Sequence, residues 1–292
     1  MSRFLLVAIV LLGTCTVAMA QTLRFETNVG DFDMVLNPND DPNLQPLVDN
    51  MVAYVGLGRY HFTAINRAVD RDNDNPADDF VLQMGGFLAF QPTTGMWPQL
   101  ASAVERLPEA IVDENGDGNV DFDSISNTRG TVSLALAGSD VNSGTSSFFI
   151  NLGNNSSLDS QGFVPFAEIQ NMSTIDTIMG LDQVDLSNDF GSPGNLTFID
   201  VPVVEEDRLV LIRRVTVVEA DDEFSFVGPI ATALQEQNLG SDSSALSSLS
   251  TSSLSSDIPA TSALMSTNVP EPSALWLLAP LALWGASRMR RR

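Results

Sequence analysis

Short runs in which apolar and polar residues alternate dominate the middle of the chain, and this two-residue period predicts β-strands. Segments 23–25 and 32–36 flank the tetrapeptide TNVG, whose glycine can take the positive φ of a hairpin turn. Further strand-like runs lie at 131–136, 148–152 and 208–218. The middle of the chain is therefore expected to be mainly β.

One segment has helical spacing instead. Apolar residues recur there at intervals of three and four, at Leu44, Leu47, Val48, Met51, Val52 and Val55. Gly56 and Gly58 follow where such a helix should end, so the spacing predicts a helix over 44–55. A second, short helix is expected over 224–237, where it would close off the domain. Many strands with one or two helices favour a closed barrel with helical caps.

The first end of the chain has the features of a targeting segment. Residues 1–20 combine Arg3, an apolar run and the ending Ala-Met-Ala, which predicts a secretory signal peptide cut before Gln21. The alternative is a buried N-terminal helix. The single cysteine, Cys15, lies inside this segment, so its removal leaves a mature chain with no internal disulfide and no catalytic thiol.

The other end, 269–292, begins with Val-Pro-Glu-Pro and continues with about fifteen mostly apolar residues and four arginines. Arginines at one end of an apolar helix suit the cytoplasmic side of a membrane. This layout resembles the PEP-CTERM sorting signal of Gram-negative bacteria, which implies transient membrane association and processing by an exosortase-like protease; the alternative is a permanent anchor. Before it, residues 221–268, which are serine-rich from residue 240 onward, predict a flexible linker, either plain or glycosylated.

The chain is strongly acidic. It has 14 basic and 37 acidic residues, with a formal charge of −23, and every basic residue is an arginine. The formal charge becomes about −27 when the two ends are left out, because they carry five of the arginines and one of the acids. Such a field repels phosphate backbones, so we expect no nucleic-acid partner. It favours solubility, and it would attract divalent cations outside the cell.

Six sequence blocks resemble, in order, the successive blocks of bacterial cyclophilins. They are LRFETNVGDF from residue 23, the helix leading into Gly-Arg-Tyr60, INRA from 65 with FVLQMGGF from 80, NTRGTVSLA from 127, SSFFINL from 146, and LDSQGFVPFAEI from 158. The resemblance covers residues 22–218 and implies one domain over 22–220. The implied fold is a closed eight-stranded antiparallel barrel capped by two helices, and the implied activity is peptidyl-prolyl cis-trans isomerisation.

The resemblance also implies roles for individual residues. Arg67 would donate hydrogen bonds that favour the twisted amide, in a reaction that breaks no bond and requires no cofactor. Gln83 and Ala135 would hold the peptide backbone. The remaining positions would form the proline pocket and its rim, with Phe80 counted among the catalytic residues: Phe80, Val81, Phe149, Leu158 and Phe163.

Some positions depart from the family pattern. Asn66 and Ser147 replace the histidine and glutamine usual there, Ser157 stands where many relatives have an aromatic residue, and Met84 replaces a glycine. These departures keep a second function open, namely a catalytically weak or inactive module that binds proline peptides at the cell surface or in the extracellular matrix. A hydrolase is disfavoured because His61 is the only histidine.

Two acidic insertions interrupt the family pattern. In the first, Gly118 is the sixth residue of a stretch whose spacing resembles an EF-hand calcium loop, with Ser124 in place of the final glutamate. It is either a weak Ca²⁺ site or a solvated turn. The second insertion, 70–79, offers the same two alternatives. The oxygen-bearing residues of the first are Asp113, Asn115, Asp117, Asn119 and Asp121.

Together these features predict an exported monomer. Its expected location is the periplasm, cell surface or extracellular matrix of a Gram-negative bacterium. Its expected partners are proline-containing exported polypeptides and the sorting protease.

Overall fold

The computed structural model describes residues 21–69, 79–90, 99–187, 196–204, 208–220 and 224–249. The predicted signal peptide, the sorting tail over 269–292, the second acidic insertion except Asp79, and the rest of the serine-rich segment lie outside these ranges. Within the described ranges, no helix combines the length and apolar character that a membrane span requires.

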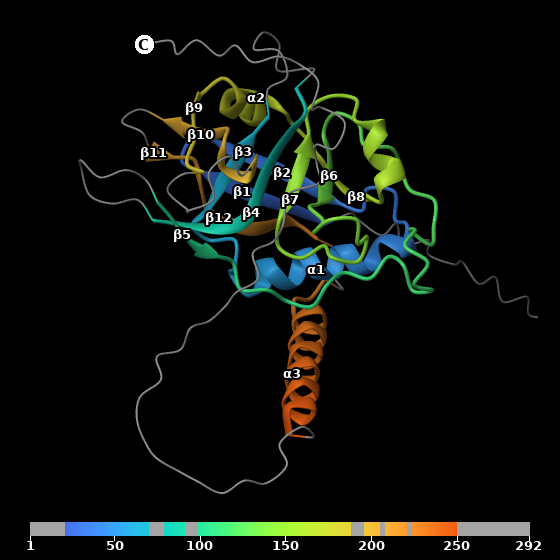
Figure 1. Cartoon of the computed structure of the whole chain (residues 1–292). Coiled ribbons are helices and arrows are strands. Elements are labelled where there is room, and N and C mark those ends of the chain that lie inside the picture. The colour runs from blue at the N-terminus through green and yellow to red at the C-terminus, as the bar shows by residue number, and fades with distance from the viewer. Residues whose placement is uncertain are drawn as a thin grey trace, which may run out of the picture.

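Eight antiparallel strands close into a ring within the described part of the chain (Figure 1). Their order is β3-β12-β1-β2-β8-β6-β7-β4, and β4 pairs back with β3. A further strand, β5 (Gln99–Ala103), pairs with the outer end of β4. The predicted mainly β fold with eight strands in a closed arrangement is confirmed. The ring strands are β1 (Thr22–Thr27), β2 (Asp31–Leu36), β3 (Thr63–Ala68), β4 (Val81–Phe90), β6 (Thr131–Leu134), β7 (Phe148–Asn151), β8 (Pro165–Ile169) and β12 (Leu211–Glu219).

Two helices accompany the ring, α1 (Gln45–Gly56) and α2 (Ser173–Met179), which lie below and above the strands in Figure 1. The first agrees with the helix predicted over 44–55. A short 3₁₀ helix, η1 (Pro42–Leu44), leads into it, and the Asp41 side chain caps that turn by accepting from the backbone N–H of Asn43. The helix ends before Gly58, which has a φ of +68°. Its apolar stripe is buried against the strands, as the spacing predicted.

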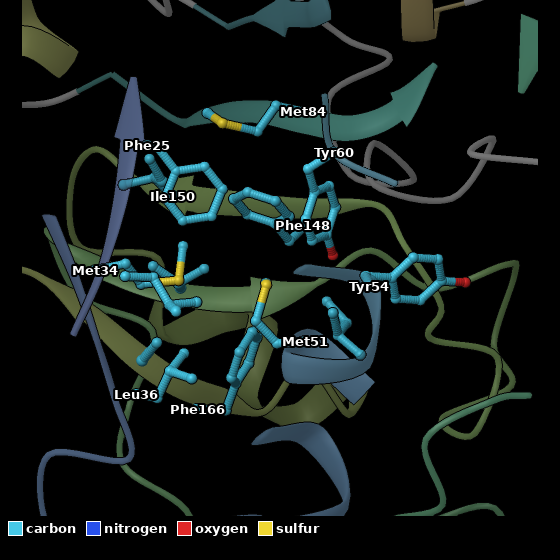
Figure 2. Packing of buried hydrophobic residues seen from close by; sticks show 14 of the residues in the cluster. Phe25, Met34, Leu36, Met51, Tyr54, Tyr60, Met84, Phe148, Ile150 and Phe166 are labelled. Carbon is cyan, nitrogen blue, oxygen red and sulfur yellow. The ribbon is translucent and has the colours of Figure 1, made fainter. Parts of the chain in front are cut away.

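The interior of the ring is filled by large apolar side chains (Figure 2). Phe148 of β7 lies at its centre, with its ring edge-on to those of Phe25 and Tyr60 at centroid distances of 5.7 and 5.6 Å. Met51 of α1 and Phe166 of β8 reach the same interior. Each such side chain contributes roughly 1.5–3 kcal/mol by leaving water. This core fixes which residues of the ring strands point outward.

A small second sheet lies on the outside of the ring. It consists of β9 (Asp182–Val184), β10 (Val201–Val204) and β11 (Arg208–Leu209), with the 3₁₀ helix η3 (Leu196–Phe198) beside them. Its apolar residues pack on Ala64 of β3 and Phe87 of β4, and the rings of Phe87 and Phe198 are 4.9 Å apart. The single strand predicted over 208–218 is therefore divided between two sheets.

Helix α3 (Val227–Leu249) begins three residues later than the helix predicted from residue 224 and extends into the serine-rich segment interpreted as a linker. Its start packs on the end of α1. A Cβ at Gly56 would lie only 2.7 Å from Ile230 Cδ1 and 2.8 Å from Phe226 Cδ1, so the close approach of the two helices depends on that glycine. Figure 1 shows the rest of α3 projecting away from the strands.

Gly85 provides a test of the packing between β4 and its neighbours. It has a φ of +82°, and a Cβ there would lie 2.7 Å from the Ser146 carbonyl oxygen and 2.9 Å from Tyr60 Cε1. We expect Gly85→Ala to lower the free energy of unfolding by roughly 2–5 kcal/mol, from backbone strain and overpacking together. Urea denaturation measures this loss.

The matched control is Gly116→Ala, where φ is +76° and no atom lies within 4 Å of the added Cβ. It should cost only the strain of the left-handed backbone, about 1–2 kcal/mol. Equal losses in the two variants would show that the close packing around Gly85 contributes nothing.

Candidate functional site

Four residues on four neighbouring strands form one row across the outside of the ring. Arg67 of β3 pairs with Gln83 of β4, Gln83 pairs with Phe149 of β7, and Phe149 pairs with Ser133 of β6. Directly paired residues on one face have Cβ atoms roughly 5 Å apart. Phe148 points into the core, so its neighbour Phe149 points outward, because successive side chains of a strand alternate between the two faces.

Arg67 is buried, with 1% of its surface exposed. Its Nε and Nη1 groups have no hydrogen-bond acceptor among the described residues. Burial lowers the pKa of Arg67, and the nearby Asp200 carboxylate opposes that shift; the guanidinium nevertheless remains charged at neutral pH. Unpaired buried donors are costly, so this arrangement is suited to an acceptor that a ligand supplies.

Gln83 is the second polar residue of the row and pairs directly with Arg67. Its Nε2 donates to Ser147 Oγ at 3.1 Å, while its Oε1 is buried and has no partner among the described residues. Among the described residues, the row therefore offers two donor groups without an acceptor, Arg67 Nε and Nη1, and one acceptor without a donor, Gln83 Oε1. They lie beside a cluster of apolar side chains. That is the polar pattern needed to hold a peptide group, which presents one carbonyl and one N–H.

The apolar side chains beside this row form a separate, buried cluster outside the ring. It contains the five residues that the sequence analysis assigned to the pocket and its rim, each no more than 5% exposed. The rings of Phe149 and Phe163 meet edge to face at a centroid distance of 5.5 Å, and Ala135 packs against the cluster. The structure thus brings these residues together beside Arg67 and Gln83. The cluster is Phe80, Val81, Phe149, Leu158 and Phe163.

A small cleft lies next to this cluster on the side of Ala135, but neither Arg67 nor any of the five cluster residues is among the described residues that line it. Gln83 and Ala135, the two residues expected to hold a peptide backbone, both line it. So does Thr197 of η3, which the sequence analysis did not single out. The η3 segment is held there because Asn66 Nδ2 donates to the Thr197 carbonyl at 3.2 Å and the backbone N–H of Ala68 donates to the Asp200 carbonyl at 2.7 Å.

The positions that depart from the family pattern have structural contacts in this chain. Asn66 lies at an irregularity in the β3–β4 pairing and anchors η3, as described above. Ser147 accepts the hydrogen bond from Gln83, and Met84 is fully buried in the core. Ser157 is exposed on the 3₁₀ helix η2 (Ser156–Gln161), directly before Leu158.

The first acidic insertion is a turn closed by its own carboxylates. Asp113 accepts from the backbone N–H groups of Gly116, Asp117 and Gly118, and Asp121 accepts from those of Glu114 and Asn115. Across the ranges that the structure describes, no three acidic, histidine or cysteine side chains converge as a metal site would require. Calcium binding at this turn stays a prediction.

Comparison with known families gives a match to the cyclophilin type peptidyl-prolyl cis-trans isomerase model over residues 22–197. Two crystal structures of such an isomerase from Cryptosporidium parvum are similar to this chain at 17% identity. One match covers 69% of this chain and 99% of that chain, with a TM-score of 0.41. The other, a structure in the presence of the dipeptide Ala-Pro, covers 68% and 99%, with a TM-score of 0.40. No curated protein matches the chain.

Proposed function

Because the chain belongs to the family of cyclophilin type peptidyl-prolyl cis-trans isomerases, we propose that it catalyses rotation about X-Pro bonds of exported polypeptides, with Arg67 as the hydrogen-bond donor. The barrier to that rotation is about 18–20 kcal/mol because the amide loses its resonance when it twists. No covalent bond breaks, so the site requires no nucleophile and no cofactor. It requires a pocket for the proline ring and a fixed donor.

The observation that carries this proposal is the buried Arg67 guanidinium beside the five-residue apolar cluster, whose Nε and Nη1 have no acceptor among the described residues. In a twisted amide the nitrogen lone pair is localised and can accept a hydrogen bond. A donor that is already positioned favours this state over the planar amide and lowers the barrier. The arginine fork keeps its charge and its orientation, which suits it to this task.

The neighbouring residues would orient the substrate. The apolar cluster would take the proline ring, while Gln83 and Ala135 would hold the peptide backbone along the cleft. The unpaired Gln83 Oε1 supports this role because it can accept from a peptide N–H. The substrate would then be held on both sides of the bond that rotates.

A second function has a specific observation in its favour. The pocket residues and Arg67 are almost fully buried, and the residue before Leu158 is the exposed Ser157, whose small side chain cannot act as an aromatic rim. Restricted access and a weakened rim would slow turnover. The alternative is therefore a catalytically weak or inactive module that binds proline peptides at the cell surface or in the extracellular matrix.

Removal of the guanidinium tests the catalytic role. We expect Arg67→Ala in the full-length chain to lower kcat/KM for a proline tetrapeptide about 100-fold or more in a protease-coupled assay, as for other positioned donors. Arg67→Lys should recover only part of this loss, because the charge returns without the fork. The control is Arg214→Ala, which removes an exposed arginine paired with Glu26.

Two outcomes would contradict this assignment. If wild type accelerates isomerisation and Arg67→Ala is equally active, another group is the donor. If wild type does not accelerate isomerisation but binds the peptide in a calorimetric titration, the binding-module alternative takes the place of the enzyme.

We further propose weak Ca²⁺ binding at the 113–121 turn. Five side chains there carry oxygen atoms at alternate positions, and the absence of the final glutamate predicts a dissociation constant of roughly millimolar magnitude. Calorimetric titration of wild type should show binding that Asp113→Asn abolishes. Heats that are identical in the two proteins, or absent at about 10 mM Ca²⁺, would leave the turn as a purely hydrogen-bonded structure.

Export is proposed from the two ends of the chain. The signal-like residues 1–20 and the tail over 269–292 predict a mature monomer that starts at Gln21, associates transiently with the membrane and is processed by an exosortase-like protease. Amino-terminal sequencing of protein from fractionated Gram-negative cells tests this. A chain that begins at Met1 in the cytoplasm would contradict it.

A further inference from the structure

Three buried asparagines lie behind the apolar cluster. Asn127 precedes β6, Asn151 ends β7, and Asn155 precedes η2, and their exposed fractions are 0%, 0% and 1%. Such amides are costly to bury unless they are hydrogen-bonded. Their partners therefore indicate what these residues hold in place.

Asn127 uses the full hydrogen-bonding capacity of its side chain. Its Nδ2 donates to the Asp159 carboxylate and to the Phe163 carbonyl, both at 2.8 Å. Its Oδ1 accepts from Ser133 Oγ at 2.9 Å and from Asn151 Nδ2 at 3.0 Å. An amide offers two donors and two acceptor sites, so each is occupied.

The network continues to the other side of the pocket. Asn155 Nδ2 donates to Asn151 Oδ1 at 2.9 Å and to the Phe80 carbonyl at 2.7 Å. The backbone N–H of Asn155 donates to the Asn127 carbonyl at 2.8 Å. Phe80 and Phe163, which lie on separate segments, are thus tied to one hydrogen-bonded unit through their backbone carbonyls. Leu158 lies in η2 between Asn155 and Asp159, which are both members of the same hydrogen-bonded unit.

The acceptor at the outer end of the network is charged. Burial raises the pKa of Asp159, but hydrogen bonds from Ser126 Oγ, the Asn127 backbone N–H and the Asn127 side chain outweigh it and lower the pKa. An ionised carboxylate makes a stronger hydrogen bond with an amide donor than a neutral acceptor does. The middle of η2 and the segment before β6 are therefore held firmly together at Asp159.

We propose that Asn127 is a positioning residue for the proline pocket: through Phe163, Asp159 and the Asn151–Asn155 pair it fixes the distance between the two walls that Phe80 and Phe163 provide. This rests on the proposed function in one respect, that the apolar cluster receives the proline ring. Asn127 itself does not touch the substrate. Its effect should therefore appear in substrate binding and not in the rotation step.

The test compares two asparagines of similar chemistry in the full-length protein. Asn28 also uses its amide on the backbone, donating to the Leu209 carbonyl at 2.9 Å and accepting from the Leu211 N–H at 2.8 Å, but it lies in the β1–β2 hairpin. Both alanine variants should lose stability in urea. Only Asn127→Ala should raise KM and the Kd of a proline tetrapeptide, by about tenfold, with kcat changed less than about twofold.

A double-mutant cycle measures the coupling between two substitutions in the Kd of the peptide, and general destabilisation would not change this coupling. Because Asn127 acts through the pocket wall, the rises in Kd caused by Asn127→Ala and Leu158→Ala should be strongly non-additive, whereas Asn28→Ala and Leu158→Ala should combine additively. If Asn127→Ala does not fold, Ser133→Ala removes one of its four hydrogen bonds and should give a smaller rise in Kd.

The outcomes separate this inference from the proposed function. Equal Kd and KM in Asn127→Ala and Asn28→Ala, with an active wild type, would overturn the positioning role and leave the isomerase intact. A wild type that binds the peptide without isomerising it would overturn the isomerase, and the Kd comparison would still decide the role of Asn127. A wild type that neither binds nor isomerises would overturn both.

Discussion

Hydrogen bonding between β3 and β4 closes the ring of strands, and both the core and the candidate site depend on this pairing. Without it, the two strands would be exposed edges with unpaired backbone groups. The pairing is irregular on both sides of Ile65, where the register shifts. Such irregularities bend a strand and redirect its side chains. Here they accompany the change from Ile65, which faces the core, to Arg67, which pairs with Gln83 in the outer row.

The site is therefore built on the back of the core. Phe148 and Phe149 are neighbours in sequence, but one fills the interior of the ring and the other belongs to the outer apolar cluster. Packing of Phe148 against Phe25 and Tyr60 holds β7 rigidly, and that rigidity extends to Phe149. A site on such strands is positioned more precisely than one on loops alone.

Much of this arrangement could be predicted from local sequence. The strands around the TNVG turn and the helix near Leu47 follow from periodicity, and the family blocks identified the five residues that the structure gathers beside Arg67. The roles of those residues remain predictions. The second sheet could not be predicted, because its docking on Ala64 and Phe87 depends on long-range contacts that leave no period in the chain. Nor could the linkage of Asn127, Asn151 and Asn155, since nothing in their spacing indicates that all three are buried.

The asparagine network has a consequence for the conditions under which the pocket keeps its shape. Amide groups neither gain nor lose protons across the pH range of living cells and their surroundings, and they are not reduced or oxidised as thiols are. Asp159 is the one titratable member of the described hydrogen bonds to Asn127, and the hydrogen bonds from Ser126 and Asn127 lower its pKa from the ordinary aspartate value. The support of the pocket is therefore indifferent to acidity down to mildly acid conditions and to the redox state of the compartment, so a protein that left the buffered cytoplasm would carry the same pocket geometry with it.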